Sequence, residues 1–259
     1  MHEEIKQLAL KTVETIHRTV KKALTHEFHA MGKNIGIGAD GTPTKYLDKI
    51  AEDAALRCIK KSGMKINVLS EEAGFIDHHA PYTFVLDPVD GTRNAVRGIP
   101  FYAVSLAVGQ KTISDVEYGI VQHIPTGDVF IAEKGKGAYL NKHRIMVPEV
   151  PANELLSCLA LGKHADTKTT HLGTQNYVRA FGCSSLEMCY VATGGFDYYM
   201  VERNYLRVTD IAAATLVVRE AGGFVYNLAG DILDMEFSLQ ERTNILVAGS
   251  EKIIHDLLQ

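Results

Sequence analysis

One six-residue run, Asp87-Pro88-Val89-Asp90-Gly91-Thr92, constrains this chain more than any other feature. It follows an apolar segment at 82–86 with the composition of a strand, so Asp87 is expected at the carboxyl end of a strand and Asp90 just beyond it. Two carboxylates about 4 Å apart repel by roughly 4 kcal/mol at an effective dielectric of about 20. A shared divalent cation such as Mg²⁺ relieves this repulsion most simply. The run predicts a metal site, although Asp-Gly taken alone is more typical of a hairpin turn.

Two further acidic segments lie in fitting contexts. Glu71 and Glu72 follow a predicted strand at 66–69, where a solvated acidic loop is the alternative. Asp210 stands at the start of a nearly all-apolar helix that two glycines close at 222–223. An N-cap is the simpler explanation of Asp210 taken alone. Capping and metal ligation can, however, use different carboxylate oxygens.

In their order along the chain, these motifs resemble the signatures of the inositol monophosphatase family. That group, with fructose-1,6-bisphosphatase as a relative, comprises Mg²⁺-dependent, lithium-sensitive phosphomonoesterases. The resemblance extends over about residues 38–249, and the segments 38–48, 98–103 and 206–208 are most similar to archaeal members, which often hydrolyse both inositol monophosphate and fructose 1,6-bisphosphate. Thr209 stands where many members have Trp, so the packing beside Asp210 must differ.

The resemblance implies an α+β fold, a layered αβαβα sandwich with the metal cluster between two halves. The residue pattern accommodates it, with helices at 3–30 and 45–61, strands at 66–69, 82–87 and 102–109, and an antiparallel meander at 114–122, 129–133 and 138–140. Two prolines within 147–152 predict a boundary between an N-terminal half, 1–147, and a C-terminal half, 148–259. The second half alternates strands at 155–161 and 179–181 with helices at 169–177, 184–192 and after Asp210.

The resemblance also implies which residues hold metal ions. Glu71, Asp87 and the backbone carbonyl of Val89 would bind a first Mg²⁺ ion. Asp87 would bridge to a second ion held by Asp90 and Asp210, and a third, looser ion would share Glu71. Mn²⁺ is the expected substitute. Most of these ligands belong to the N-terminal half, and the last belongs to the C-terminal half.

Catalytic roles follow from the same resemblance. Asp48 and Thr92 would orient and deprotonate the attacking water beside the ion on Glu71, and Glu72 would support the ligands without binding an ion. Hydrolysis of a phosphate monoester requires a reduction in barrier on the order of 20 kcal/mol. Clustered divalent ions can supply much of this, because they activate water and neutralise the leaving alkoxide.

Substrate contacts are expected on both sides of the ions. The backbone N–H groups of Gly91 and Thr92 at a helix start offer a phosphate seat, and a glycine lets the backbone approach closely. By resemblance, Ser184 lies near the leaving alcohol. Arg203 falls where many members have a carboxylate, and it suits a second phosphate through a bidentate contact. Arg179 and Arg207 would assist, with a surface salt bridge as the alternative for each arginine.

Composition excludes several other classes of protein. The 27 basic and 31 acidic residues give a net charge of −4, which predicts no nucleic-acid partner. The four cysteines contain no Cys-x-x-Cys pair, as in a cytoplasmic protein with reduced thiols. The longest apolar stretch, at 99–108, is far shorter than the roughly 20 residues of a membrane span. We expect a cytoplasmic protein without a signal peptide and, by resemblance, a homodimer.

The function predicted from these features is Mg²⁺-dependent hydrolysis of small sugar or polyol phosphates, such as fructose 1,6-bisphosphate or inositol monophosphate, by attack of an activated water. One alternative is a phosphatase of NADP or 3′-phosphoadenosine nucleotides. Another is a non-catalytic sugar-phosphate-binding relative. A binding module, however, has no need of carboxylates for several ions.

Overall fold

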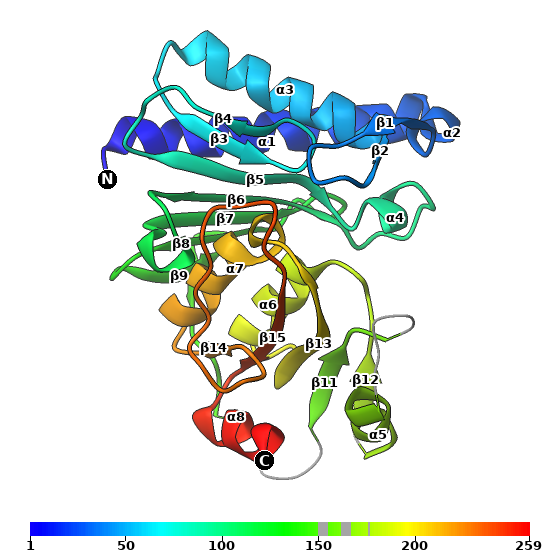
Figure 1. The fold of residues 1–259 in the computed structure, drawn as a ribbon, viewed down its shortest axis with the longest axis vertical. Helices are drawn as coiled ribbons and strands as arrows, with labels where there is room; N and C mark the ends of the chain where they lie inside the picture. The colour runs from blue at the N-terminus through cyan, green and yellow to red at the C-terminus, as the bar shows by residue number, and fades with distance from the viewer. Residues whose placement is uncertain (150–154, 162–166, 176) are drawn as a thin grey trace.

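The computed structural model describes residues 1–149, 155–161, 167–175 and 177–259, which fold into stacked layers of helices and sheets (Figure 1). The helices are α1 (Glu3–His26), α2 (Phe28–Met31), α3 (Tyr46–Ser62), α4 (Thr92–Ala95), α5 (Thr167–Gln175), α6 (Ser184–Ala192), α7 (Val208–Glu220), α8 (Glu251–Leu258) and the 3-10 turn η1 (Ile113–Asp115). A small ribbon pairs β1 (Asn34–Ile37) with β2 (Pro43–Lys45). The larger sheet contains β3 (Asn67–Ser70), β4 (Gly74–Ile76), β5 (Thr83–Asp90), β6 (Ala103–Gly109), β7 (Tyr118–His123), β8 (Val129–Glu133), β9 (Gly137–Leu140) and β10 (His143–Ile145). The smaller sheet contains β11 (Leu156–Leu159), β12 (Tyr177–Arg179), β13 (Tyr198–Leu206), β14 (Phe224–Tyr226) and β15 (Thr243–Ala248).

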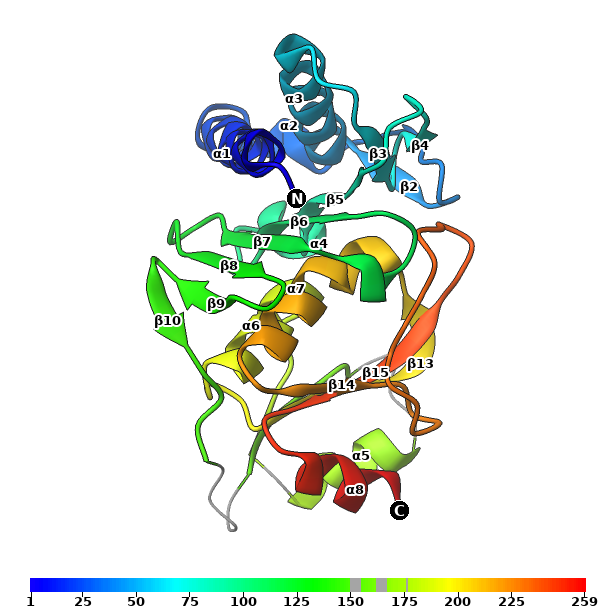
Figure 2. The same cartoon turned by 90° about the vertical axis from the view of Figure 1, so that its left-hand side faces the viewer.

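The layers follow one another as helix, sheet, helix, sheet and helix. α1 and α3 cover the outer face of the larger sheet, α6 and α7 fill the space between the sheets, and α5 and α8 lie against the outer face of the smaller sheet (Figures 1 and 2). This order confirms the predicted αβαβα sandwich.

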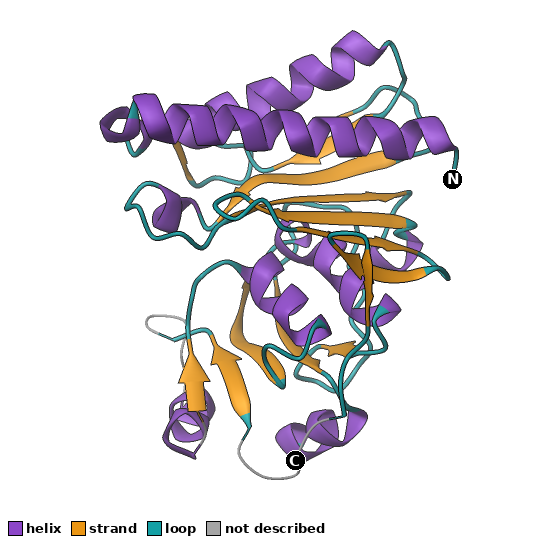
Figure 3. Ribbon diagram, turned by 180° about the vertical axis from the view of Figure 1, so that it is seen from behind, coloured by secondary structure: helices purple, strands orange, loops and turns teal. Residues whose placement is uncertain are grey.

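The outer helices form because their apolar residues recur at helical spacing. On α1, the side chains of Leu8, Val13, Ile16 and Val20 are buried against the sheet and α3, which runs beside α1 (Figure 3). The helix predicted over 3–30 is wrong at its end. Glu27 has φ −133° and ψ 31°, outside the helical region, and it separates α1 from α2.

The larger sheet contains the predicted antiparallel meander. Its strand order in the described residues is β10-β9-β8-β7-β6-β5-β3-β4, and β3 and β5 are parallel neighbours. β5 and β6 are buried along their whole length because helices cover both faces. The strand predicted over 114–122 begins later, at Tyr118. The carboxylate of Asp115 accepts hydrogen bonds from the backbone N–H groups of Lys111 and Thr112, which stabilises the turn η1 instead.

The central helix α7 is apolar on all sides because it lies between the sheets. It belongs to the predicted C-terminal half but packs on the larger sheet, where a Cβ on Gly119 would lie 2.8 Å from the Ala213 carbonyl oxygen. Buried residues of both halves, such as Val121 and Val217, belong to one hydrophobic cluster. The helix therefore fixes the two sheets relative to each other.

The predicted boundary at 147–152 lies partly outside the described residues, and the division at 147/148 stays a prediction. The strand predicted at 179–181 begins two residues earlier, as β12. The helix predicted at 169–177 is α5, which ends at Gln175, and residue 176 lies outside the described residues. In the part of the chain that the structure describes, no helix has the length and apolar character needed to cross a membrane.

Candidate active site

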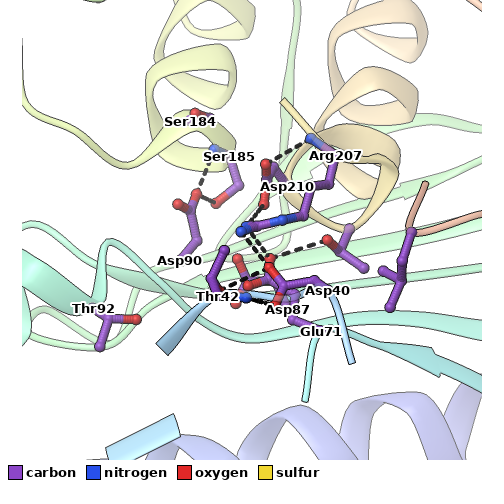
Figure 4. A network of polar contacts seen from close by, with 12 residues as sticks. Asp40, Thr42, Glu71, Asp87, Asp90, Thr92, Ser184, Ser185, Arg207 and Asp210 are labelled. Carbon is purple, nitrogen blue, oxygen red and sulfur yellow. Dashed lines mark hydrogen bonds and ion pairs between the residues drawn. The ribbon is translucent and has the colours of Figure 1, made fainter. Parts of the chain in front are cut away.

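Acidic side chains from distant segments converge where β3 and β5 end beside α7 (Figure 4). β3 and β5 are parallel and pair Ser70 with Leu86, so Glu71 and Asp87 follow at the same edge of the sheet. Among the described residues, Glu71, Asp87 and Asp210 each offer a carboxylate oxygen, and these oxygens lie within 4.8 Å of one another. Asp90 and Val89 line the same cavity of about 440 Å³. The predicted metal ligands therefore share one site.

A β-bulge brings Asp87 and Asp90 to the same cavity. Residues three apart on a regular strand point to opposite faces. Here Asp87 pairs with Ser105 and Asp90 pairs with Ala103, so β5 has one more residue than β6 between these pairs. The expectation that Asp90 lies beyond the strand is wrong, because Asp90 is the last residue of β5.

Asp90 is held by the start of α6. Its Oδ2 accepts hydrogen bonds from the backbone N–H of Ser185 at 2.7 Å and from the Ser185 hydroxyl at 2.6 Å, and the Cys183 thiol donates at 3.2 Å. Burial and then the charge of Asp210 raise the pKa of Asp90 to about 6. Ser185 and Cys183 are not among the site residues predicted from the sequence, and only the serine pair at a helix start could have indicated them.

The two carboxylate oxygens of Asp210 have different partners: one caps helix α7, and the other faces the acidic cluster. The N-cap of α7 is Arg207, and Asp210 is the third helical residue, so the simple N-cap explanation of Asp210 is wrong. Its Oδ2 accepts a hydrogen bond of 2.8 Å from the backbone N–H of Arg207, as in a capping box. The other oxygen, Oδ1, lies 3.7 Å from Nη1 of Arg207. One oxygen caps the helix and the other is left to the cluster.

The cluster has more negative charge than its surroundings neutralise. Burial, followed by the charge of Asp210, raises the pKa of Glu71 well above its usual range. Burial and the charge of Glu71 do the same for Asp87. Arg207 supplies a cation, with Nη1 2.9 Å from Glu71 and Nη2 2.5 Å from Asp40. Converging oxygen ligands with uncompensated charge fit a divalent ion, so the cluster can bind a metal ion.

Asp48 and Thr92 are in contact, as a shared role in orienting and deprotonating the attacking water requires. The Thr92 hydroxyl lies 2.8 Å from Oδ1 of Asp48 and 2.8 Å from the Val89 carbonyl oxygen, so its single proton serves one acceptor at a time. Burial raises the pKa of Asp48 to about 7. The hydroxyl of Thr44 donates a hydrogen bond to the Glu72 carboxylate. Asp48, Glu72 and Thr92 line a neighbouring cavity of about 690 Å³, and Glu71 and Thr92 line both cavities.

Gly91 is the N-cap of the single-turn helix α4 and needs to be glycine. Its φ is +85°, and a Cβ there would lie 3.1 Å from the Phe101 carbonyl oxygen and 3.2 Å from the Cβ atoms of Cys183 and Tyr102. Gly91 and Thr92 line both cavities. The phosphate seat assigned to them stays a prediction.

The three arginines predicted to contact the substrate lie in different surroundings, and their substrate roles stay predictions. Arg203 and Arg179 are exposed and line neither cavity, and Nη1 of Arg179 donates to the Val178 carbonyl oxygen. Arg207 pairs with acidic groups of the cluster. Ser184 lines the smaller cavity, and its place near the leaving alcohol stays a prediction. Arg93 and Arg97, which are not among the site residues predicted from the sequence, line the larger cavity. Their spacing of four residues directly after the metal motif could have indicated them.

Comparisons with known proteins agree with this geometry. The model of the inositol monophosphatase family matches residues 1–259. The fructose-1,6-bisphosphatase/inositol-1-monophosphatase of Methanothermobacter thermautotrophicus is 35% identical over 98% of this chain and 95% of its own. The protein of the same name from Thermococcus kodakarensis is 39% identical over 88% and 86%. A solved Pyrococcus horikoshii structure, described as a hypothetical protein with similarities to inositol-1 monophosphatase, has a TM-score of 0.86 at 32% identity, covering 99% of this chain and 97% of its own.

Proposed function

This chain belongs to the inositol monophosphatase family, and we propose that it is a Mg²⁺-dependent phosphatase of sugar or polyol phosphates. The family predicted from the sequence is confirmed, and the chain is a phosphoric monoester hydrolase. One observation carries the metal-dependent chemistry: the carboxylates of Glu71, Asp87 and Asp210 face one another at the cavity that Asp90 also lines. Fructose 1,6-bisphosphate and inositol monophosphate, named in the relatives, are the proposed substrates.

The donor set supports Mg²⁺ as the resident ion, with Mn²⁺ as a substitute, because every side-chain ligand is a carboxylate. Glu71, Asp87, Asp90, Asp210 and the carbonyl of Val89 would hold two or three ions. When bound, the ions activate water and neutralise charge on the phosphoryl group and the leaving alkoxide.

The chain's own residues supply the remaining functions. Asp48, with a pKa of about 7, is suited to accept a proton from water beside Thr92, because a general base works best near the operating pH. The Thr92 hydroxyl orients that water. The backbone N–H groups of Gly91 and Thr92 hold a phosphate oxygen, and the positive φ of Gly91 lets the chain turn into α4 at this point.

Arg93 and Arg97 are proposed to bind the second phosphate of a bisphosphate substrate. Both are exposed and line the larger cavity, which Asp48 and Glu71 also line. Within the described residues, neither guanidinium has an ion pair or a hydrogen bond. A guanidinium binds phosphate in a bidentate geometry. These two residues take the place that the sequence analysis gave to Arg203.

Other properties of the protein are proposed from the family resemblance alone: inhibition by Li⁺ and a homodimeric state. The cysteines Cys58, Cys158, Cys183 and Cys189 are free and buried, which supports the proposed cytoplasmic location. The relatives described above are named for fructose bisphosphate and inositol phosphate, so NADP and 3′-phosphoadenosine nucleotides are the less supported substrates.

Phosphate release from a panel of substrates tests the proposal. The purified protein is assayed with fructose 1,6-bisphosphate, inositol 1-phosphate, NADP and 3′-phosphoadenosine 5′-phosphate, in Mg²⁺, in EDTA, and in Mg²⁺ with Li⁺. We expect Mg²⁺-dependent release that is fastest with the first two substrates. No release from any substrate would indicate a binding relative, and preference for the nucleotides would favour the alternative.

A further inference from the structure

Glu187 is a buried carboxylate outside the group of Glu71, Asp87 and Asp210 that the described residues bring together, and it lines the cavity of about 440 Å³ that contains this cluster. It lies in the first turn of α6, and its exposed fraction is 3%. Leu159, Leu161 and Ala180 line the same cavity. The cavity thus combines a metal-binding region with apolar side chains and a separate carboxylate.

The hydrogen bonds of Glu187 are all on one oxygen. Oε1 accepts from the backbone N–H of Phe181 at 2.8 Å, from that of Gly182 at 2.9 Å and from the Cys158 thiol at 3.2 Å. Among the described residues, no donor contacts Oε2. In the described residues, the side-chain polar atoms that are fully buried and have no hydrogen-bond partner are Ser105 Oγ, Arg207 Nε and Thr215 Oγ1. Oε2 of Glu187 does not belong to this group, so it is not fully buried. Oε2 is therefore accessible from the cavity.

Because Oε2 is accessible while the rest of Glu187 is buried, a hydrogen-bond donor of a bound ligand is its expected partner. A carboxylate has about four acceptor sites, and an unused one in a buried position costs free energy. Burial and the charge of Asp90 raise the pKa of Glu187 to about 7. The ionised form of Glu187 would repel a phosphate oxygen, whereas a neutral hydroxyl can donate a hydrogen bond to it. The part of the substrate near Glu187 is thus the alcohol rather than the phosphate.

We propose that Oε2 of Glu187 accepts a hydrogen bond from a hydroxyl group of the alcohol that leaves the phosphate. This makes Glu187 a specificity-determining residue for polyol phosphates over esters whose leaving group lacks a hydroxyl donor. The apolar residues Leu159 and Leu161 contact the C–H faces of the same alcohol. The inference rests on the proposed phosphatase function, which p-nitrophenyl phosphate can test separately.

The experiment compares Glu187→Gln with wild type on inositol 1-phosphate and on p-nitrophenyl phosphate. The amide oxygen of Gln can accept the hydrogen bonds from Phe181 and Gly182, which leaves an N–H₂ group toward the cavity. We expect kcat/KM for inositol 1-phosphate to fall about 10- to 100-fold, as on loss of a hydrogen bond to a charged group. The change with p-nitrophenyl phosphate should stay below about threefold.

Glu202→Gln is the matched control. Glu202 is a half-buried carboxylate on β13 that accepts hydrogen bonds from the backbone N–H and hydroxyl of Thr169, and it lines neither cavity. We expect this variant to keep wild-type kinetics on both substrates. Equal losses of Glu187→Gln on the two substrates would show that Glu187 only holds residues 181–182. No loss on either would exclude the contact.

Deoxy analogues of inositol 1-phosphate test the same contact from the substrate side. In wild type, removal of one particular hydroxyl should cost about 10- to 100-fold in kcat/KM, and this cost should disappear in Glu187→Gln. If the variant does not fold, the wild-type series decides, because the absence of any costly position overturns the inference. Wild type that hydrolyses neither ester in Mg²⁺ would instead refute the phosphatase proposal.

Discussion

Nη1 of Arg207 lies 2.9 Å from Oε1 of Glu71, so an arginine contacts a predicted metal ligand directly. The same guanidinium reaches Asp40 through Nη2, and the Thr209 hydroxyl donates to Glu71 at 3.1 Å. The carboxylates of Glu71, Asp87, Asp40 and Asp210 raise the pKa of Arg207 against the effect of burial. Arg207 thus neutralises part of the cluster's charge.

Arg207→Gln should destabilise the metal-free protein by about 3 kcal/mol, because it leaves buried carboxylates without their cation. Mg²⁺ should restore part of this loss by supplying positive charge. Thermal unfolding in EDTA and in Mg²⁺ measures both effects. Arg203→Gln, at an exposed position, is the control and should change stability by less than about 0.5 kcal/mol. Equal stability of the two variants in EDTA would contradict the role of Arg207.

Asp90→Asn should lower kcat by roughly two orders of magnitude or more, because it removes a formal charge from the ion site. The Asn carbonyl oxygen can still accept the hydrogen bonds from Ser185, so the fold should persist. Phosphate release at saturating Mg²⁺, together with a thermal unfolding curve, separates the two effects. Unaltered turnover would count against the assignment of Asp90 as a ligand.

Asp48→Asn tests the raised pKa of Asp48, which is about 7 against an ordinary value of 3.8. The folded state binds the Asp48 proton more tightly than the unfolded state. The favourable contribution of this proton is therefore complete below about pH 4 and is lost as pH rises to about 7. In EDTA, wild type should lose stability relative to Asp48→Asn across this range, by at most about 4 kcal/mol. Urea unfolding at several pH values measures the difference, and a constant difference would refute the shift.

The double variant Arg93→Ala/Arg97→Ala should weaken the binding of fructose 1,6-bisphosphate far more than the binding of inositol 1-phosphate. Loss of charge-assisted hydrogen bonds to a second phosphate predicts about a 10- to 100-fold rise in KM for the bisphosphate. Inositol 1-phosphate has a single phosphate, so its KM should change by less than about threefold. Arg203→Ala is the control and should affect neither substrate. A larger effect from Arg203→Ala would restore the assignment made from the sequence.

Gly91→Ala should destabilise the protein by about 2–4 kcal/mol. Its φ of +85° disfavours a side chain, and the new Cβ would crowd Phe101, Tyr102 and Cys183. Gly127→Ala is the matched control, because Gly127 has a φ of +84° but nothing within 4 Å of an added Cβ. The control should cost only about 1 kcal/mol. Similar losses in the two variants would show that crowding at Gly91 is unimportant.

The sequence alone determined the family, through its motifs, and the layered fold and the metal-ligand candidates follow from that resemblance. The local patterns accommodate this fold and place each motif at the end of a strand or the start of a helix. The strand before Asp87, the glycine after Asp90 and the apolar residues of α7 each act through near neighbours in the chain. The ends of helices and strands, as at Glu27 and Tyr118, do not follow from these patterns, because the conformation of single residues decides them.

Only the tertiary structure decided which groups meet. Ser185 contacts Asp90 across 95 residues, and Arg207 contacts Glu71 across 136. The bulge that turns Asp87 and Asp90 to one cavity depends on pairing with β6. Such contacts follow from how the sheets and α7 pack, and the spacing of residues along the chain does not encode them.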